Sequence, residues 1–132
     1  MRVRSLDHFV LRVRDLDRSL AFYRGLLGLS VEGLDECRRG ARPFVSVRIG
    51  GSLLDLVPDP GFDPTSAVEG RFVHFCVTVD DLPEAIRVLR EAGVQFLHDE
   101  PVARGGAQGV GPSIYAQDPD GCVIELKERI SE

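Results

Sequence analysis

The stretch HFVLRVRDLDRSLAFYR at residues 8–24 returns, altered but recognisable, as HFCVTVDDLPEAIRVLR at residues 74–90. Both stretches start with His-Phe, carry Asp-Leu at the same place and end with Arg. Two later stretches also resemble each other, GSLLDL at residues 51–56 and GCVIEL at residues 121–126. The sequence therefore predicts two equivalent modules, each with a histidine near its start and a carboxylate near its end.

The composition of the 132-residue chain is that of one domain with a sizeable core, since 43% of the residues are apolar. Each half has about 60 residues, a length at which burial is marginal, so the halves are expected to share a core. The net charge of −5 comes from mixed acidic and basic residues, with no basic block. This pattern argues against nucleic acid and membrane partners.

The three cysteines are odd in number and lack metal-ligand spacing. Cys76 and Cys122 lie in apolar runs, so we expect buried thiols at both positions. Free thiols are typical of a reducing compartment, and this cysteine usage favours the cytoplasm.

Each module is predicted to hold a strand, a helix and three further strands. The modules span residues 3–58 and 71–128, joined by a linker at 59–70 that is rich in turn formers. Strands are expected at 5–13, 30–38, 43–49 and 52–58, and again at 71–79, 95–102, 112–117 and 121–128. Helices packed on one face of such sheets define an α+β fold rather than a doubly wound parallel sheet.

The helices have clear start and stop signals. Asp15 and Asp81 are predicted N-caps, and Gly28 and Gly93 are placed to end the two helices. In the second module, residues 103–113 (ARGGAQGVGPS) are expected to form a glycine-rich loop.

Strand side chains alternate between the two faces of a sheet, and this alternation predicts that four polar side chains share the face away from the helices. In each module the neighbours of the histidine and of the carboxylate are apolar and are expected to face the helices. The polar side chains then point to the opposite face, which becomes a concave cavity if the sheets curve. They are His8, Asp55, His74 and Glu125.

Imidazole and carboxylate groups are suitable ligands for Zn, Ni, Fe, Mn or Co, and geometry selects among these ions. A single histidine in a strand is more often a core or surface residue than a ligand. Two histidines and two carboxylates in equivalent positions favour a metal site, because an unpaired buried carboxylate is costly.

Three strings of the sequence resemble a known family. They are residues 6–29 (LDHFVLRVRDLDRSLAFYRGLLGL), 73–94 (VHFCVTVDDLPEAIRVLREAGV) and 114–126 (IYAQDPDGCVIEL). Together they resemble the vicinal oxygen chelate (VOC) superfamily, which includes glyoxalase I, bleomycin- and fosfomycin-resistance proteins, methylmalonyl-CoA epimerase and extradiol dioxygenases. The segment PVARGGAQG at 101–109 is most similar to the glyoxalase-domain or virulence-associated branch.

The resemblance implies one VOC domain over residues 1–132, in which tandem βαβββ modules form an eight-stranded incomplete barrel around a divalent metal. It places metal ligands at His8, His74 and Glu125. The fourth ligand position is Asp55, one methylene shorter than the usual Glu, so a direct bond or a bridging water is possible there.

The resemblance to glyoxalase I also implies a function. The chain would be a metal-dependent lyase or isomerase that acts on a small substrate with vicinal oxygens through a metal-stabilised enediolate, with Glu125 or Asp55 as the base. Arg12 matches a glutathione-contacting arginine, and Arg104 matches a basic anion-binding residue, although a salt bridge at the barrel edge explains Arg12 equally well. Asp59 departs from the asparagine expected there.

Two other functions stay open. The cavity could sequester a drug without chemistry, as resistance proteins of the family do. A small Fe(II) extradiol-type dioxygenase is the third reading, with Tyr115 as acid/base helper. The histidine expected near residues 106–108 is missing, however, and a barrel aromatic with its hydroxyl at the rim is the favoured explanation of Tyr115. A homodimer is implied because several family members complete their sites across subunits, and the modules could pair within one chain or between two.

Overall fold

The computed structural model describes residues 2, 4–63 and 73–130, which fall in two compact units, Met1–Ser66 and Ala67–Glu132. Most of the predicted linker at 59–70, and the first residues of the strand predicted at 71–79, lie outside the described residues. None of the helices in the described segments is both long and apolar enough to cross a bilayer.

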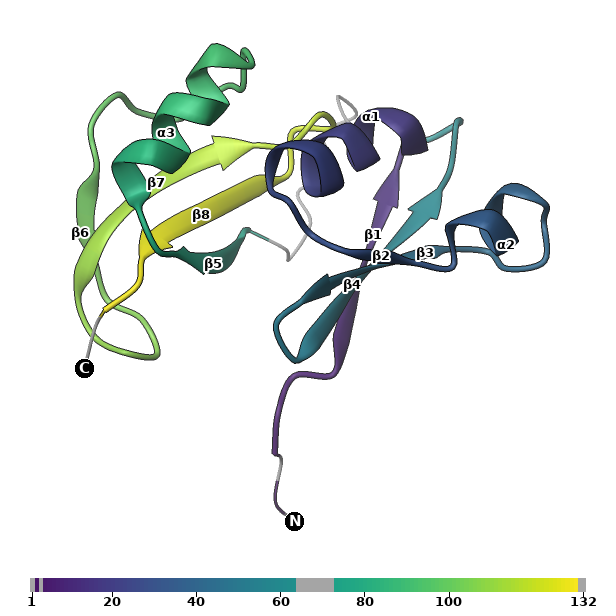
Figure 1. Cartoon of the computed structure of the whole chain (residues 1–132), viewed down its shortest axis with the longest axis horizontal. Coiled ribbons are helices and arrows are strands. Elements are labelled where there is room, and N and C mark those ends of the chain that lie inside the picture. Colours follow the sequence, from purple (N-terminus) through teal and green to yellow (C-terminus); the bar gives the residue numbers. More distant parts are fainter. Residues whose placement is uncertain (1, 3, 64–72, 131–132) are drawn as a thin grey trace. The chain divides into compact units, whose positions relative to one another are not determined.

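The first unit is a four-stranded mixed sheet with helices (Figure 1). Its strands lie in the order β1-β4-β3-β2, with β1 parallel to β4 and the other neighbours antiparallel. The elements are β1 (His8–Val13), α1 (Leu16–Leu20), η1 (Ala21–Leu26), β2 (Val31–Glu32), α2 (Leu34–Arg38), β3 (Val45–Ile49) and β4 (Ser52–Pro58).

The second unit repeats this topology. Its strands lie in the order β5-β8-β7-β6, again with one parallel pair, β5 with β8. The elements are β5 (Phe75–Val79), α3 (Leu82–Glu91), β6 (Val102–Arg104), β7 (Gly111–Gln117) and β8 (Val123–Glu128). The predicted α+β class and the repeated order of one strand, one helix and three strands are confirmed, except that the first unit has an additional short helix, α2, between β2 and β3. Neither sheet closes on itself.

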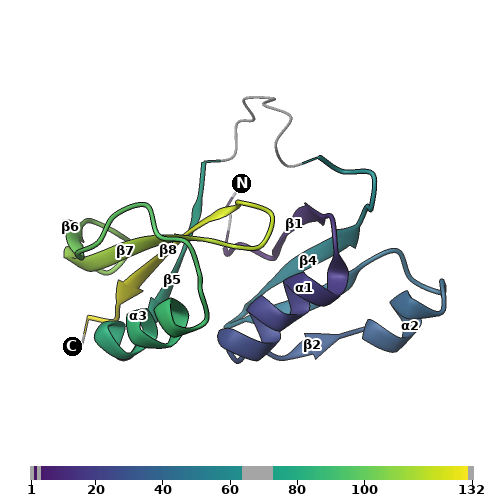
Figure 2. The ribbon, with the colours of Figure 1, turned by 90° about the horizontal axis from the view of Figure 1, so that it is seen from above.

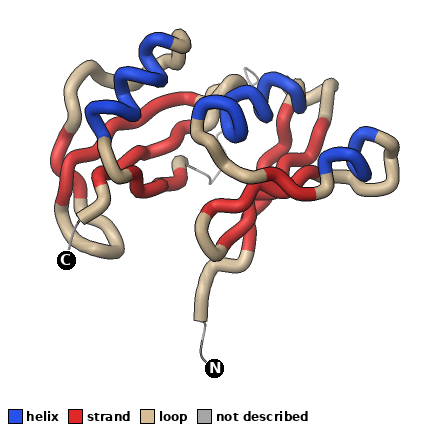
Figure 3. Tube along the Cα trace, viewed as in Figure 1, coloured by secondary structure: helices blue, strands red, loops and turns tan. Residues whose placement is uncertain are grey.

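The apolar sides of the two sheets carry the core. Leu54 and Leu56 of β4 and Ile124 and Leu126 of β8 are almost fully buried. The continuous helix formed by α1 and η1 in the first unit, and α3 in the second, each lie along this side of their own sheet (Figures 2 and 3). Burial of the leucines and isoleucines supplies the main stabilising free energy, because apolar area is removed from water.

The predicted helix signals are present. The Asp15 carboxylate accepts a hydrogen bond from the Arg18 N–H at 3.2 Å, and the Asp81 carboxylate accepts one from the Glu84 N–H at 3.1 Å. Each bond satisfies one of the free donors at a helix start. Gly28, with φ 69°, follows the first helix, and Gly93 with φ 80° follows α3 in the same way.

The first helix widens after one turn. The Leu27 N–H donates to the Phe22 carbonyl at 3.0 Å, five residues back, so η1 is a π-helix. The wider turn leaves two adjacent aromatic residues, Phe22 and Tyr23, both buried against the sheet. The 3.6-residue periodicity that predicts the helix does not indicate this change.

The strand predicted at residues 30–38 is wrong over most of its length, because β2 is only Val31–Glu32 and α2 occupies Leu34–Arg38. Gly33 lies between them with φ 78°, which ends the extended backbone. Asp35 and Glu36 lie in the first turn of α2, where acidic side chains favour a helix start.

The strand predicted at 95–102 is also wrong in extent. Segment 95–97 pairs with β7 through two backbone bonds, Leu97 N–H to Tyr115 and Gln117 N–H to Gln95, and the next strand, β6, starts only at Val102. Pro101 offers no N–H for a ladder, which favours a break there. The predicted glycine-rich loop at 103–113 is shortened by β6 and β7 to residues 105–110.

Candidate functional site

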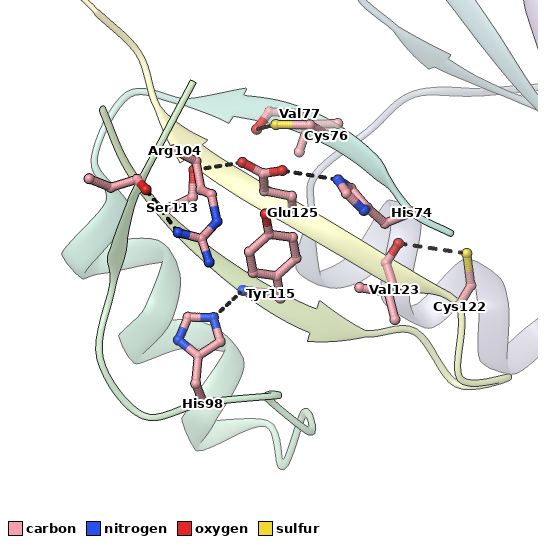
Figure 4. Close-up of polar contacts among 11 residues, drawn as sticks. His74, Cys76, Val77, His98, Arg104, Ser113, Tyr115, Cys122, Val123 and Glu125 are labelled. Carbon is pink, nitrogen blue, oxygen red and sulfur yellow. Dashed lines mark hydrogen bonds and ion pairs between the residues drawn. The ribbon is translucent and has the colours of Figure 1, made fainter. Parts of the chain in front are cut away.

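The second unit brings together two of the predicted ligands. Phe75 pairs with Ile124 in parallel register. His74 precedes Phe75 and Glu125 follows Ile124, so both side chains lie on the side of the sheet opposite the helix. The His74 Nε2 and Glu125 Oε1 atoms are 3.1 Å apart (Figure 4). The carboxylate side chain is 7% exposed and the imidazole 33% exposed, so the pair is reachable from the histidine side.

Strand β7 supplies further contacts to Glu125. The Ser113 hydroxyl donates to Glu125 Oε2 at 2.7 Å, and Tyr115 lies directly opposite Glu125 in the antiparallel β7–β8 pair. The Tyr115 ring meets the His74 ring edge to face, with centroids 5.2 Å apart at 90°. Figure 4 shows these four side chains converging.

The pKa of Glu125 is lowered although the residue is buried. Desolvation is the largest single influence and raises the pKa, but hydrogen bonds from Ser113, Tyr115 and His74 and the charge of His74 outweigh it. Glu125 is therefore ionised at neutral pH, the state that binds a cation or accepts a proton.

His98 holds Tyr115 from behind. The Tyr115 backbone N–H donates to His98 Nε2 at 3.2 Å, and His98 Nδ1 lies 2.7 Å from the Glu100 carbonyl. A carbonyl accepts only, so the proton is on Nδ1 and Nε2 is the acceptor. The His98 ring nitrogen thus accepts the hydrogen bond from the Tyr115 N–H that a backbone carbonyl of a neighbouring strand would otherwise accept. No motif or repeat in the sequence predicts a role for His98, and only its residue type is a signal.

Arg104 lies on the same side of the sheet as the predicted ligands. Its guanidinium carbon is 5.8 Å from the centroid of the Tyr115 ring, and one of its N–H groups donates to the Ala103 carbonyl at 2.9 Å. Most of its donors stay available on an exposed side chain, which suits the anion-binding role that the resemblance implies.

The first unit carries the other histidine. His8 Nδ1 lies 2.7 Å from the Asp7 carboxylate, and this hydrogen bond, more than the charge of Asp55, raises the pKa of His8. A proton held on Nδ1 leaves Nε2 as the free donor atom, the arrangement in which metal-bound histidines are usually found. The Asp-His dipeptide in the sequence is the signal that could have shown this partner.

Asp55 is buried and held by a chain of polar groups. The Ser46 hydroxyl donates to Asp55 Oδ1 at 2.6 Å, and the Arg42 guanidinium donates to the Ser46 oxygen at 2.7 Å. Ser46 is opposite Asp55 in the β3–β4 pair. Val10 pairs with Asp55, so His8 precedes the carboxylate by two positions in register, the same stagger that relates His74 to Glu125. Each unit therefore contains a histidine and a serine-bound carboxylate.

Arg12 forms an ion pair. Its Nε atom is 3.2 Å from the Asp59 carboxylate, and both side chains are substantially exposed. This is the salt bridge considered as the alternative to substrate binding, and it explains why an acid stands at position 59. Such an exposed pair contributes about 0–1 kcal/mol, so it does not prevent Arg12 from binding a ligand.

Cys76 contradicts the prediction of a buried thiol, because it is exposed, and Cys122 is only half-buried. Cys76 is opposite Glu125 in the β5–β8 register and faces away from the helix. Partial burial and the nearby Glu125 charge raise the pKa of Cys76 to about 11, so its thiol is neutral at pH 7.

A pocket of about 190 Å³ lies on this side of the second sheet. Cys76 and Thr78 of β5, Glu125 and Lys127 of β8, and the loop residues 105–108 form its walls. Lys127 is 4% exposed, and the sequence analysis gives it no role. Its position two residues after Glu125 on the same face of β8 is the signal that could have found it.

The described structure brings only one pair of the predicted metal ligands into contact. His74 lies with Glu125 in one unit, and His8 shares a sheet with Asp55 in the other. Within the described residues, no three His, Cys, Asp or Glu side chains form a group arranged for a metal ion. The four-ligand set thus stays a prediction.

Fold and site together define a class of protein. The sequence model of the Glyoxalase/Bleomycin resistance protein/Dioxygenase superfamily matches residues 5–126, and the chain belongs to this superfamily, also called VOC. The glyoxalase domain-containing protein RDO1 of Mycosarcoma maydis is 37% identical over 96% of this chain and 69% of its own length.

The resemblance to virulence-associated proteins is confirmed too. The crystal structure of virulence protein STM3117 from Salmonella typhimurium aligns with a TM-score of 0.75 at 26% identity, covering 98% of this chain and 100% of that one. Among enzymes, mouse methylmalonyl-CoA epimerase is 29% identical over 93% of this chain and 73% of its own length. Lactoylglutathione lyase of Salmonella typhimurium is 28% identical over 93% of this chain and 91% of its own length.

Proposed function

We propose that the chain is a metal-dependent lyase or isomerase of the glyoxalase type, acting on a small substrate with two adjacent oxygen atoms. The His74–Glu125 pair, 3.1 Å between nitrogen and oxygen, is the observation that carries the proposal. The epimerase and the lyase among the relatives support a reaction in which a proton moves at carbon. The drug-binding and dioxygenase readings are outcomes of the test below.

The donor atoms in the second unit fit a divalent metal. Histidine nitrogen and carboxylate oxygen both bind Zn²⁺ at about 2.0–2.2 Å, so two ligands at 90–110° are roughly 2.9–3.5 Å apart. The separation of 3.1 Å between His74 Nε2 and Glu125 Oε1 lies in this range. His8 and Asp55 are the further ligands that the proposal assigns, within one chain or between two copies.

A bound metal would supply Lewis-acid polarisation of the substrate oxygens. Ser113 and Tyr115 keep the Glu125 carboxylate ionised and fix its orientation. Asp55, held by Ser46, is the second buried carboxylate that could take a proton from substrate carbon. Two carboxylates in equivalent places allow one to bind the cation while the other accepts the proton.

Arg104 and Tyr115 are the substrate-binding residues of this proposal in the second unit. The ring of Tyr115 and the guanidinium of Arg104 lie together, 5.8 Å from guanidinium carbon to ring centroid, and offer a flat surface with spare donors. Arg12 is the corresponding basic residue in the first unit, already paired with Asp59. A homodimer in the cytoplasm completes the proposal.

A substrate panel tests the proposal. Purified protein, loaded in turn with Zn²⁺, Ni²⁺, Fe²⁺, Mn²⁺ or Co²⁺, is given the methylglyoxal–glutathione hemithioacetal, an acyl-CoA epimer pair or a catechol with oxygen. We expect proton exchange at substrate carbon in D₂O with the hemithioacetal or the acyl-CoA epimer pair. The rate of this exchange should be lowered about 100-fold or more in Glu125→Gln.

His98→Gln is the matched control, because among the described residues His98 forms no hydrogen bond with His74 or Glu125, and glutamine keeps an acceptor for the Tyr115 N–H. Oxygen uptake with a catechol instead would support the dioxygenase, and tight binding of a bleomycin-type drug without turnover would support the binder. Either result would contradict the proposed lyase or isomerase activity.

A further inference from the structure

We infer that Lys127 and the Gly105–Gln108 loop form an anion subsite, which binds a carboxylate or phosphate group carried by the substrate. That the bound anion is part of a substrate rests on the proposed function, but the subsite itself is a property of the second unit alone. It names the substrate class: a small molecule with an oxyanion beyond its two adjacent oxygens.

Within the described part of the chain, Lys127 is a buried cation with one hydrogen-bond partner. It is 4% exposed, and its Nζ donates to the Gly109 carbonyl. An ammonium group has three N–H donors, so two are not used by this bond. Among the residues that the structure describes, no carboxylate forms an ion pair with Lys127.

The carboxylates that line the same pocket are engaged elsewhere. Glu125 uses one oxygen toward His74 and the other toward Ser113. Glu128 Oε1 accepts from the Leu82 N–H at 3.2 Å and so serves the start of α3. A buried charge without a counter-ion is costly, and a ligand anion would remove that cost.

The pocket has the right size for such a group. Its volume of about 190 Å³ corresponds to roughly six water molecules at about 30 Å³ each. A carboxylate or a phosphate with a short carbon chain fills this space. The pocket also borders Glu125, so a molecule with its anion at Lys127 can reach this proposed metal ligand.

Gly106 of the loop lets the ammonium reach this position. A Cβ on Gly106 would lie 2.8 Å from Lys127 Nζ and 3.6 Å from its Cδ. The lysine therefore packs directly against the loop backbone. A methyl group at position 106 would move the ammonium while leaving the charge of the chain unchanged.

Titration of the whole ¹⁵N-labelled chain, freed of metal, tests the subsite. Sodium phosphate and sodium propionate are added separately at constant ionic strength, and the backbone amides of Gly105, Gly106 and Ala107 are followed by NMR. We expect saturable shifts with at least one anion; the tighter of the two shows whether the substrate group is a phosphate or a carboxylate.

The variants identify Lys127 as the cause. Lys127→Met should weaken binding about tenfold or more, the loss expected for a charge-assisted hydrogen bond. Gly106→Ala should weaken it by displacing the ammonium, and it keeps the test valid if Lys127→Met does not fold. Arg87→Met removes the same charge from exposed α3, where Arg87 pairs with Glu84 and Glu91, and should leave binding unchanged.

Shifts that rise linearly without saturation, or that are the same in wild type, Lys127→Met and Gly106→Ala, would overturn the subsite and leave Lys127 as an anchor of the loop. Zinc titration of the same samples separates the two proposals. Intact zinc binding at His74 with no anion binding contradicts only the subsite.

Discussion

Glu125 shows how neighbouring side chains decide the state of a buried carboxylate. Burial alone would favour its neutral form, yet hydrogen bonds from Ser113, Tyr115 and His74 hold its pKa below the ordinary value. The residue is thus kept in the ionised form that a metal ligand needs. Ser46 binds the Asp55 carboxylate in the first unit in a similar way.

The lowered pKa of Glu125 has a consequence for stability. A carboxylate whose native pKa is below the unfolded value, about 4.3, stabilises the native state above that value and loses this effect as pH falls through the native pKa. The difference in unfolding free energy between wild type and Glu125→Gln should therefore shrink from pH 6 to pH 3. Urea unfolding of metal-free protein measures it, and a difference that stays constant with pH contradicts the account.

Ser113→Ala gives an independent reading of the same network. Loss of the 2.7 Å hydrogen bond to Oε2 removes an influence that lowers the pKa of Glu125. We expect the ¹³C carboxyl resonance of Glu125 to titrate at higher pH in this variant than in wild type. An unchanged or lower midpoint would show that Ser113 is not a cause of the shift.

His98 should matter for stability through Tyr115. His98→Ala leaves the part-buried Tyr115 N–H without its acceptor, and an unsatisfied donor costs about 1–3 kcal/mol. His98→Gln keeps an acceptor oxygen and should cost clearly less. Equal losses in the two variants, measured by urea unfolding, would mean that the hydrogen bond is not what His98 contributes.

At the scale of elements, the turn before α2 controls the groups that hold Asp55. Gly33 combines a φ of 78° with close packing, since a Cβ there would collide with the Arg42 guanidinium. That guanidinium binds Ser46, which binds Asp55. The backbone turn and the carboxylate are therefore connected through two side chains.

Gly33 and Gly40 form a matched pair for testing this connection. Both have φ 78°, but nothing lies within 4 Å of a Cβ at Gly40. Gly40→Ala should cost about 1 kcal/mol for the left-handed backbone, and Gly33→Ala should cost more and shift the NMR signals of Ser46 and Asp55. If both variants lose the same free energy and leave Ser46 unshifted, Arg42 does not depend on Gly33.

The elements also show what can be predicted from sequence. The helix caps at Asp15 and Asp81 and the alternation around Leu54 and Ile124 are local signals, and both are present in the structure. The break of the 30–38 strand depends on the positive φ of Gly33, which the residue type permits but does not demand.

For the site, the repeat indicates which histidine and carboxylate belong together, because equivalent stagger on β1–β4 and β5–β8 follows from equivalent sequence. The roles of Ser113, His98 and Lys127 depend on contacts with residues 12, 17 and 18 positions away, on a neighbouring strand or loop. No periodicity in the sequence carries that information.

At the scale of the whole molecule, two copies of one topology each hold a histidine and a serine-bound carboxylate. Membership of the VOC superfamily defines the fold, and one fold supports many chemistries, so the function follows from the site residues. We propose that these residues bind a divalent metal.

Equilibrium dialysis against Zn²⁺, followed by metal analysis of the protein, tests that claim most directly. We predict a stoichiometric ion in wild type and in His98→Gln, and a loss of about tenfold or more in affinity in His8→Ala and in His74→Ala. Protein that binds no ion, or that binds it equally well without His8 and His74, would contradict the account.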